Sequence, residues 1–122
     1  METQVSRQAR IQAVEDRVRL AQRALEDAQA KQADAEAVLA KDKAVYFASA
    51  RAYRADIDDA KKRGNRRLYE QYCRERDKAL QLANELLDGH PGWARLRCMT
   101  ACVEEAQQDR YVALAEREAV KL

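Results

Sequence analysis

The sequence predicts an all-α protein, a long helical hairpin that forms an antiparallel coiled coil of one long helix and two shorter helices. Three observations support this prediction. The first 63 residues contain no glycine and no proline. Apolar residues recur in that stretch every seven positions, as they do in coiled coils. Strong helix breakers occur at only two places beyond it. If the long helix bends, the same pattern predicts a three-helix bundle.

The heptad repeat predicts one helix over about residues 4–62. The first position of the repeat reads Ile11, Val18, Leu25, Gln32, Leu39, Tyr46 and Tyr53. The second apolar position is mostly alanine and reads Val14, Ala21, Ala28 and Ala35. A helix with this spacing buries a narrow stripe against other helices, and the alanines allow a partner backbone to approach closely.

The first helix breaker lies in Lys61-Lys62-Arg63-Gly64-Asn65. Glycine at position 64 suits the left-handed conformation that ends many helices, and Asn65 can cap the next helix. Basic residues in the preceding turn favour the negative end of the helix dipole. The second helix is therefore predicted over about residues 66–87.

The second breaker lies in Asp88-Gly89-His90-Pro91-Gly92. Gly89 is expected to end the helix in the left-handed conformation, and Pro91 is tolerated in the first turn of the following helix. The third helix is predicted over about residues 92–120. Residues 1–122 are predicted to form a single helical domain, a usual size for one domain.

The heptad spacing shifts near Asp42. Beyond it, the apolar stripe continues best with two steps of four in succession, a stutter that locally unwinds a supercoil. The continued stripe reads Tyr46, Ala50, Tyr53, Ile57 and Ala60. Counted back from the turn at Gly64, the break at Gly89 lies opposite residues near 39. The shift and the break therefore fall at a similar height, which favours one coherent hairpin or a bend at that level.

Composition narrows the function classes. The formal net charge is only +2, so the overall charge of the chain does not by itself indicate binding to nucleic acid or to an anionic membrane. No apolar run approaches the roughly 20 residues that cross a bilayer. The N-terminus lacks the features of a signal peptide, and three cysteines are an odd number for a disulfide framework. We therefore expect a cytoplasmic protein with reduced thiols that does not bind membranes.

Basic residues gather around the first turn. Residues 51–78 carry ten positive and six negative side chains. The candidate binding residues at the turn are Lys61, Lys62, Arg63, Arg66 and Arg67. They fit an acidic protein surface or nucleic-acid phosphates, with Tyr69 and Tyr72 available for stacking on bases. The alternative is a solvated turn whose charges serve helix ends and local pairs such as Glu70–Arg74 and Asp58–Lys62.

The thiols and the single histidine suggest a zinc site only weakly. Cys98 and Cys102 share a helix face, and Cys73 and His90 complete a possible ligand set. The short Cys-x-x-Cys spacing of structural zinc sites is missing, so we expect three buried packing cysteines and no metal or cofactor. His90 is expected to cap a helix or to be exposed, rather than to act as a catalytic base.

Residues 5–35 supply mainly alanine and valine, so this arm needs a cover, either the third helix or a second protein chain. The stripe residues Ile11, Val18 and Leu25 are candidate partner contacts, and we predict a homodimer or a tight hetero-complex. Trp93 is expected to anchor the third helix in the core. Its alternative role is to anchor a partner protein, because tryptophan is favoured at binding hot spots.

Two resemblances follow from the helix layout. A long helix followed by two shorter ones is also the architecture of helical chorismate mutases, and Arg74-Glu75-Arg76-Asp77 resembles their acidic-arginine segment. The arginine, isoleucine and aspartate pattern of their first helix is absent. The hairpin layout also resembles the stalk proteins of type III secretion and flagellar export, without a shared residue motif.

We therefore expect a non-enzymatic adaptor that binds another protein, or a second copy of itself, through coiled-coil helix faces. One alternative is a small nucleic-acid-associated protein that uses the basic turn at residues 61–67. The other is a stalk-like protein of an export apparatus. Neither a catalytic residue nor a cofactor is expected.

Overall fold

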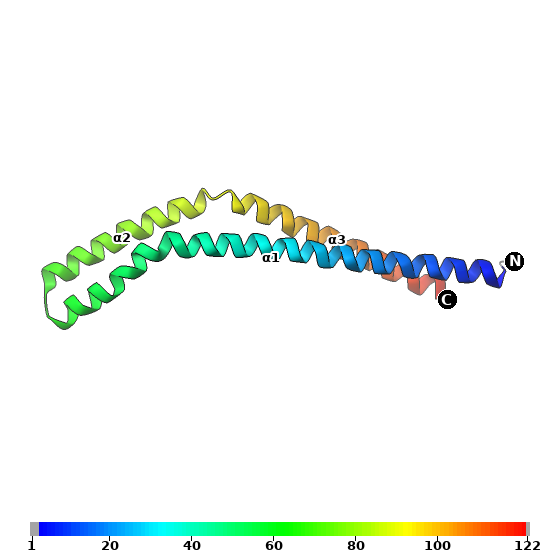
Figure 1. Cartoon of the computed structure of the whole chain (residues 1–122), viewed down its shortest axis with the longest axis horizontal. Coiled ribbons are helices and arrows are strands. Elements are labelled where there is room, and N and C mark those ends of the chain that lie inside the picture. The colour runs from blue at the N-terminus through cyan, green and yellow to red at the C-terminus, as the bar shows by residue number, and fades with distance from the viewer. Residues whose placement is uncertain (1–2, 122) are drawn as a thin grey trace. The chain divides into compact units, whose positions relative to one another are not determined.

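The computed structural model describes residues 3–121 and contains three helices, α1 (Gln4–Lys62), α2 (Arg66–Asp88) and α3 (Gly92–Lys121) (Figure 1). No strand occurs within residues 3–121. The prediction of an all-α fold with one long and two shorter helices is confirmed, and each predicted helix boundary is correct to within one residue.

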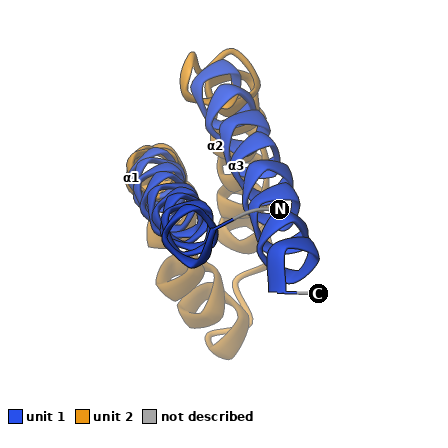
Figure 2. Cartoon of the chain, turned by 90° about the vertical axis from the view of Figure 1, so that its right-hand side faces the viewer, with its two compact units in different colours: residues 1–36, 94–122 blue, residues 37–93 orange. Residues whose placement is uncertain are grey.

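The chain divides into two compact units (Figure 2). Unit 1 combines residues 1–36 and 94–122, so its described part is the first half of α1 with most of α3. Unit 2 is the continuous segment 37–93 and contains the second half of α1 with α2. The prediction of one domain stays a prediction, and each unit is described by itself.

Unit 1 is an antiparallel pair of helices. Arg17 pairs with Glu116 at 3.3 Å, and the Gln32 amide donates a hydrogen bond to the Thr100 hydroxyl at 3.2 Å. Residue numbers therefore rise along α1 as they fall along α3. Leu25 packs with Val103 and Ala106 in a buried cluster of this unit, and the partly buried Ala28 packs against it.

The alanine-rich stripe of α1 lies inside unit 1. Val14 and Ala35 are only 1% and 2% exposed, and Leu25 is also buried, whereas Ile11 and Val18 are half-buried. The sequence left open whether the third helix or a second protein chain packs on this arm, and in the structure α3 packs on it. The stripe is therefore not a free surface for a second chain while unit 1 keeps this packing.

Unit 2 is also antiparallel. On the side of the Gly64 turn, the Tyr53 and Tyr72 ring centroids lie 6.4 Å apart. Beyond the far end of α2, the His90 Nε2 atom lies 2.7 Å from the Asp42 carboxylate, and the His90 ring centroid lies 6.1 Å from that of Tyr46. The buried side chains of this unit are Leu39, Ala50, Ile57, Ala60 and Ala83.

These burials confirm the predicted shift of the apolar stripe, because Ala50 and Ile57, the two positions that the shift displaces by one residue, are both buried. The predicted height of the α2–α3 break is confirmed as well. His90 contacts Asp42, and Leu39 lies so close to Gly92 that a Cβ atom built there would meet its Cδ1 at 3.4 Å.

The two helix junctions differ in their backbone. Gly64 has φ +67°, as predicted, and the Asn65 N–H donates to the Ala60 carbonyl at 3.0 Å, which closes α1. The Asn65 side chain then accepts a hydrogen bond from the Leu68 N–H and caps α2. Gly89 has φ −85°, so the predicted left-handed conformation is wrong there. Its N–H donates to the Glu85 carbonyl at 3.2 Å instead and continues the helical pattern.

Candidate partner-binding groove

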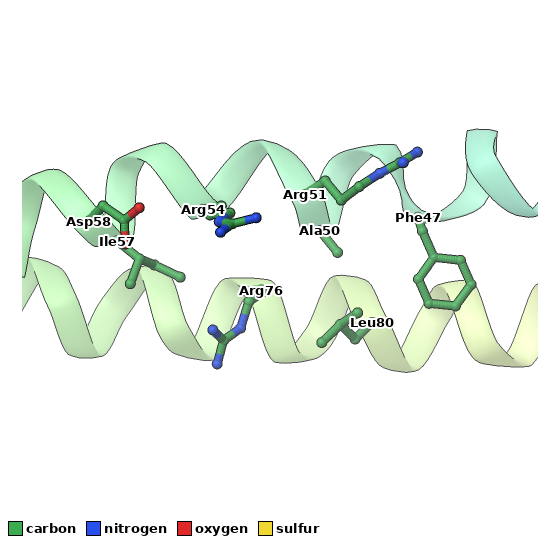
Figure 3. A pocket seen from close by; sticks show the side chains of 8 residues that line it. All are labelled: Phe47, Ala50, Arg51, Arg54, Ile57, Asp58, Arg76 and Leu80. Carbon is green, nitrogen blue, oxygen red and sulfur yellow. The ribbon is translucent and has the colours of Figure 1, made fainter.

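Within unit 2, α1 and α2 leave a groove of about 420 Å³ along one side of their contact. We call it the arginine groove (Figure 3). Its lining residues are Phe47, Ala50, Arg51, Arg54, Ile57 and Asp58 from α1, with Arg76 and Leu80 from α2.

The floor of the arginine groove is apolar. Ala50 and Ile57 belong to the buried stripe of α1, whereas Phe47 and Leu80 are only half-buried. Figure 3 shows Phe47, Ala50 and Ile57 extending from α1 toward the facing stretch of α2. Because successive helical residues differ by about 100°, Phe47 leaves the helix beside Tyr46, which faces the core. The floor on α1 therefore consists of buried stripe residues together with Phe47, which is adjacent in sequence to the stripe residue Tyr46.

The rim of the arginine groove is basic. Arg51 donates a hydrogen bond of 2.7 Å to the carbonyl of Ala44, two turns earlier, so its side chain lies along α1 toward Phe47. Arg76 is half-buried and pairs with its exposed neighbour Asp77 at 3.3 Å. Arg54 forms no ion pair with any residue in the range 3–121.

A second hollow of about 350 Å³ continues the groove along α1 and shares Phe47 and Arg51 with it. Its other lining residues are Ala40, Lys43 and Ala44. The outer residues of the two hollows follow one another in steps of three and four, and they read Ala40, Ala44, Phe47, Arg51, Arg54 and Asp58. This spacing keeps them on one face of α1 for five turns, long enough to accompany a docked helix.

The chemistry of the groove suits an amphipathic acidic segment. The lining of the first hollow holds three arginines and one aspartate over an apolar floor. Guanidinium groups bind carboxylates with two parallel hydrogen bonds and stack well on flat or apolar surfaces. A helix that carries aliphatic side chains flanked by glutamate or aspartate would match both the floor and the rim.

All five predicted turn residues are exposed. Arg63 pairs with Asp59 at 3.3 Å and Arg66 with Glu70 at 3.1 Å, so two of the five cations form local pairs, as the alternative of a solvated turn expects. The two example pairs, Glu70–Arg74 and Asp58–Lys62, do not form within residues 3–121. The remaining cations, Lys61, Lys62 and Arg67, have no ion pair within the described chain. Lys61 and Arg66 also line a shallow hollow of about 270 Å³ together with Tyr69.

Trp93 and His90 depart from the expectations. Trp93 is 38% exposed, so its prediction as a core anchor is wrong, and its indole N–H donates to the Leu87 carbonyl at 2.8 Å. His90 is nearly buried, with 8% of its side chain exposed. Its Nδ1 accepts a hydrogen bond from the Gly92 N–H at 2.7 Å, which makes it the predicted helix cap but not an exposed residue.

The cysteines are less buried than predicted. Cys98 and Cys102 are exposed and Cys73 is half-buried, so burial of all three as packing residues is wrong. Cys98 and Cys102 share a face of α3, but the core of unit 1 uses the neighbouring Val103 and Ala106 instead. Among residues 3–121, no cluster of three or more histidine, cysteine or acidic side chains could hold a metal ion.

Asp16, an acidic residue of unit 1, lies outside the arginine groove. The hydrogen bond from Arg19, followed by that from Gln12, lowers the pKa of the Asp16 carboxyl. This pair belongs to the exposed surface of unit 1, where a hollow is lined by Asp16, Arg19, Leu20 and Arg23. These partners stabilise the ionised carboxylate locally and point to no chemistry.

The chain matches no protein-family model, and no significant match is found among curated proteins or solved structures. No helix within the described residues has the length and apolar character needed to cross a membrane. Sequence reasoning counted Arg51, Arg54 and Arg76 in the basic cluster but assigned the candidate site to the turn. The sequence signal for the groove was the face of α1 that contains Ala44, Phe47, Arg51 and Arg54 in steps of three and four, next to the buried stripe.

Proposed function

We propose that this chain is a non-enzymatic protein-binding module whose arginine groove receives an amphipathic, acidic helix of another protein. The observation that carries this proposal is an apolar floor left open beside a core contact and bordered by arginines. Apolar area supplies most of the affinity in such interfaces, and buried arginine contacts fix the partner and its register.

Two features of the groove support this choice of partner. The floor is half-exposed at Phe47 and Leu80, both of which are common anchor types for helix-in-groove binding. Arg54 lacks an ion pair within residues 3–121 and is free to bind a partner carboxylate. The proposal requires no movement of α1 or α2, because the groove is open in this structure.

Site-specific photo-crosslinking in source cells tests the proposal directly. Phe47 is replaced by photoreactive p-benzoylphenylalanine, a ring of similar shape at the groove floor. We expect one dominant crosslinked species with another protein. Adding Arg51→Glu and Arg54→Glu should abolish it, because a partner that carries carboxylates is then repelled at the rim.

The matched control places the same photoreactive residue at Tyr111, an exposed aromatic position of unit 1. It should not give the same species. A crosslink at Phe47 that survives both charge reversals, or one that is equally strong at Tyr111, would contradict the groove as the binding site. The absence of any crosslinked protein at Phe47 would contradict the proposed function itself.

Nucleic-acid binding through the basic turn is a second candidate. The observation that favours it is the set of three turn cations, Lys61, Lys62 and Arg67, that are exposed and have no ion pair within the described chain. Tyr69 lines a hollow together with one of them, Lys61, and offers a stacking surface. This function uses different residues from the groove, so the two are separable by mutation.

A further inference from the structure

Unit 2 has a second exposed side, opposite the arginine groove, and it is aliphatic. Val45 and Leu82 are 64% and 58% exposed, and Val38 and Leu86 are each 47% exposed. We call these four residues the aliphatic face. Neighbouring large aliphatic side chains that are exposed to solvent are typical of an interaction surface.

The position of the aliphatic face follows from helix geometry. Tyr46 faces the core, and its neighbours Val45 and Phe47 leave α1 on opposite sides because successive residues differ by about 100°. On α2, Ala83 is buried, and Leu82 and Leu86 lie on the other side of it from Leu80, which lines the arginine groove. The four residues therefore border the side of unit 2 that faces away from the groove.

We propose that a second copy of this chain covers the aliphatic face and forms a two-fold symmetric dimer in which each α1 packs antiparallel to the other. The charge pattern around the face selects this occupant. A two-fold interface must be complementary to itself, so every positive side chain needs a negative one at the symmetric position. The arginine groove fails this condition, since its excess of arginines would face itself.

Two pairs of charged residues beside the aliphatic face, one on each helix, meet this condition. On α1, Lys41 and Asp56 lie seven to eight residues on either side of a midpoint between Ala48 and Ser49. On α2, Lys78 and Glu85 lie on either side of a midpoint between Gln81 and Leu82. Each of these charged residues lies on or next to the exposed side, and none of them has an ion pair within residues 3–121.

The two midpoints lie at a similar height. In the antiparallel register of unit 2, the contact of Asp42 with His90 places the α1 midpoint opposite about residue 83, and the contact of Tyr53 with Tyr72 places it opposite about residue 77, so the α2 midpoint lies between these two values. A single two-fold axis at that height places Lys41 near Asp56 of the second copy and Lys78 near Glu85 of the second copy. Small residues occupy the α1 positions near the axis, where two helices must approach closely, and they read Ala48, Ser49 and Ala52.

Sedimentation velocity under reducing conditions tests the dimer. We expect wild-type protein to be dimeric at tens of micromolar and Leu82→Glu to raise the dimer dissociation constant about a hundredfold, since two like charges would meet near the axis. The matched control is Leu20→Glu, which changes an equally exposed leucine of unit 1 and should leave the constant unchanged. Both leucines are exposed, so the helical circular dichroism should be retained.

A charge swap tests the register. Lys41→Glu alone and Asp56→Lys alone should each raise the dissociation constant about tenfold, and the two changes together should restore it. Wild-type protein that stays monomeric would overturn the proposal, even if another protein then binds the aliphatic face. A dimer that is insensitive to Leu82→Glu, or a swap that does not restore affinity, would overturn it as well.

Discussion

At the scale of single residues, the contacts of His90 determine its tautomer. Its Nδ1 accepts the Gly92 N–H at 2.7 Å and therefore carries no hydrogen. A neutral ring must then carry its hydrogen on Nε2, which donates to the Asp42 carboxylate at 2.7 Å. A Cβ atom on Gly92 would lie 2.7 Å from Nδ1, so glycine is required there by the ring and not by its backbone angle.

We predict that His90→Ala lowers the free energy of unfolding by about 1–3 kcal/mol, because one substitution removes a helix cap and a hydrogen bond to a charged group. Urea denaturation followed by circular dichroism measures this change. Asp42→Asn should cost less, since the amide oxygen still accepts the Nε2 hydrogen. The matched surface control, Lys43→Ala, should stay within about 0.5 kcal/mol. A loss for His90→Ala no larger than the control would refute the cap.

At the scale of secondary structure, the helix bounds could be predicted because residues at each helix end, such as glycine and a capping asparagine, mark it in the sequence. Gly64 and Asn65 fix the first junction by backbone angle and side-chain capping, both of which are local properties. The left-handed conformation predicted for Gly89 was wrong, because other groups form the hydrogen bonds that such a glycine would otherwise make at the helix end. The Trp93 indole and the His90 N–H both satisfy the Leu87 carbonyl, so no left-handed glycine is needed.

The N-cap of α2 gives a test at this scale. Asn65→Ala removes the acceptor of the Leu68 N–H, which lies at 3.2 Å, and should cost about 1 kcal/mol of unfolding free energy. Asn65→Asp should keep the cap and benefit from the positive end of the helix dipole. Equal losses for the two variants in urea denaturation would mean that the side chain does not cap α2.

The candidate site was less predictable than the helices. The buried stripe was assigned correctly as far as Ala60, because burial of apolar residues at helical spacing is a strong signal. The exposure of the residues beside the stripe was not predicted, because it depends on how much of them the packed helix covers. Cys98 and Cys102 illustrate the problem, since α3 turns Val103 inward and leaves both thiols outward. Free cysteine resembles a core residue in sequence, and only the packing angle decides its burial.

At the scale of the whole chain, charge is distributed unevenly although the total is close to neutral. The formal net charge is +2, yet the arginine groove and the turn at Gly64 both lie in unit 2. Local charge of this kind directs where a partner binds rather than whether the chain attracts polyanions in general. The groove and the turn carry different cations, so their contributions can be separated by mutation.

The turn residues decide between protein and nucleic acid as the partner. Replacing Lys61, Lys62, Arg66 and Arg67 together by glutamine should leave the helical circular dichroism nearly unchanged, because exposed substitutions usually cost within about 0.5 kcal/mol each. If the groove is the binding site, the groove crosslink at Phe47 should persist in this variant. Binding of a single-stranded oligonucleotide, measured by fluorescence anisotropy over a range of salt concentrations, should then be weak and equal in wild type and variant. An oligonucleotide affinity that falls steeply with salt in wild type, and a salt slope that flattens in the variant, would instead assign the turn to phosphate contacts and make nucleic acid the partner.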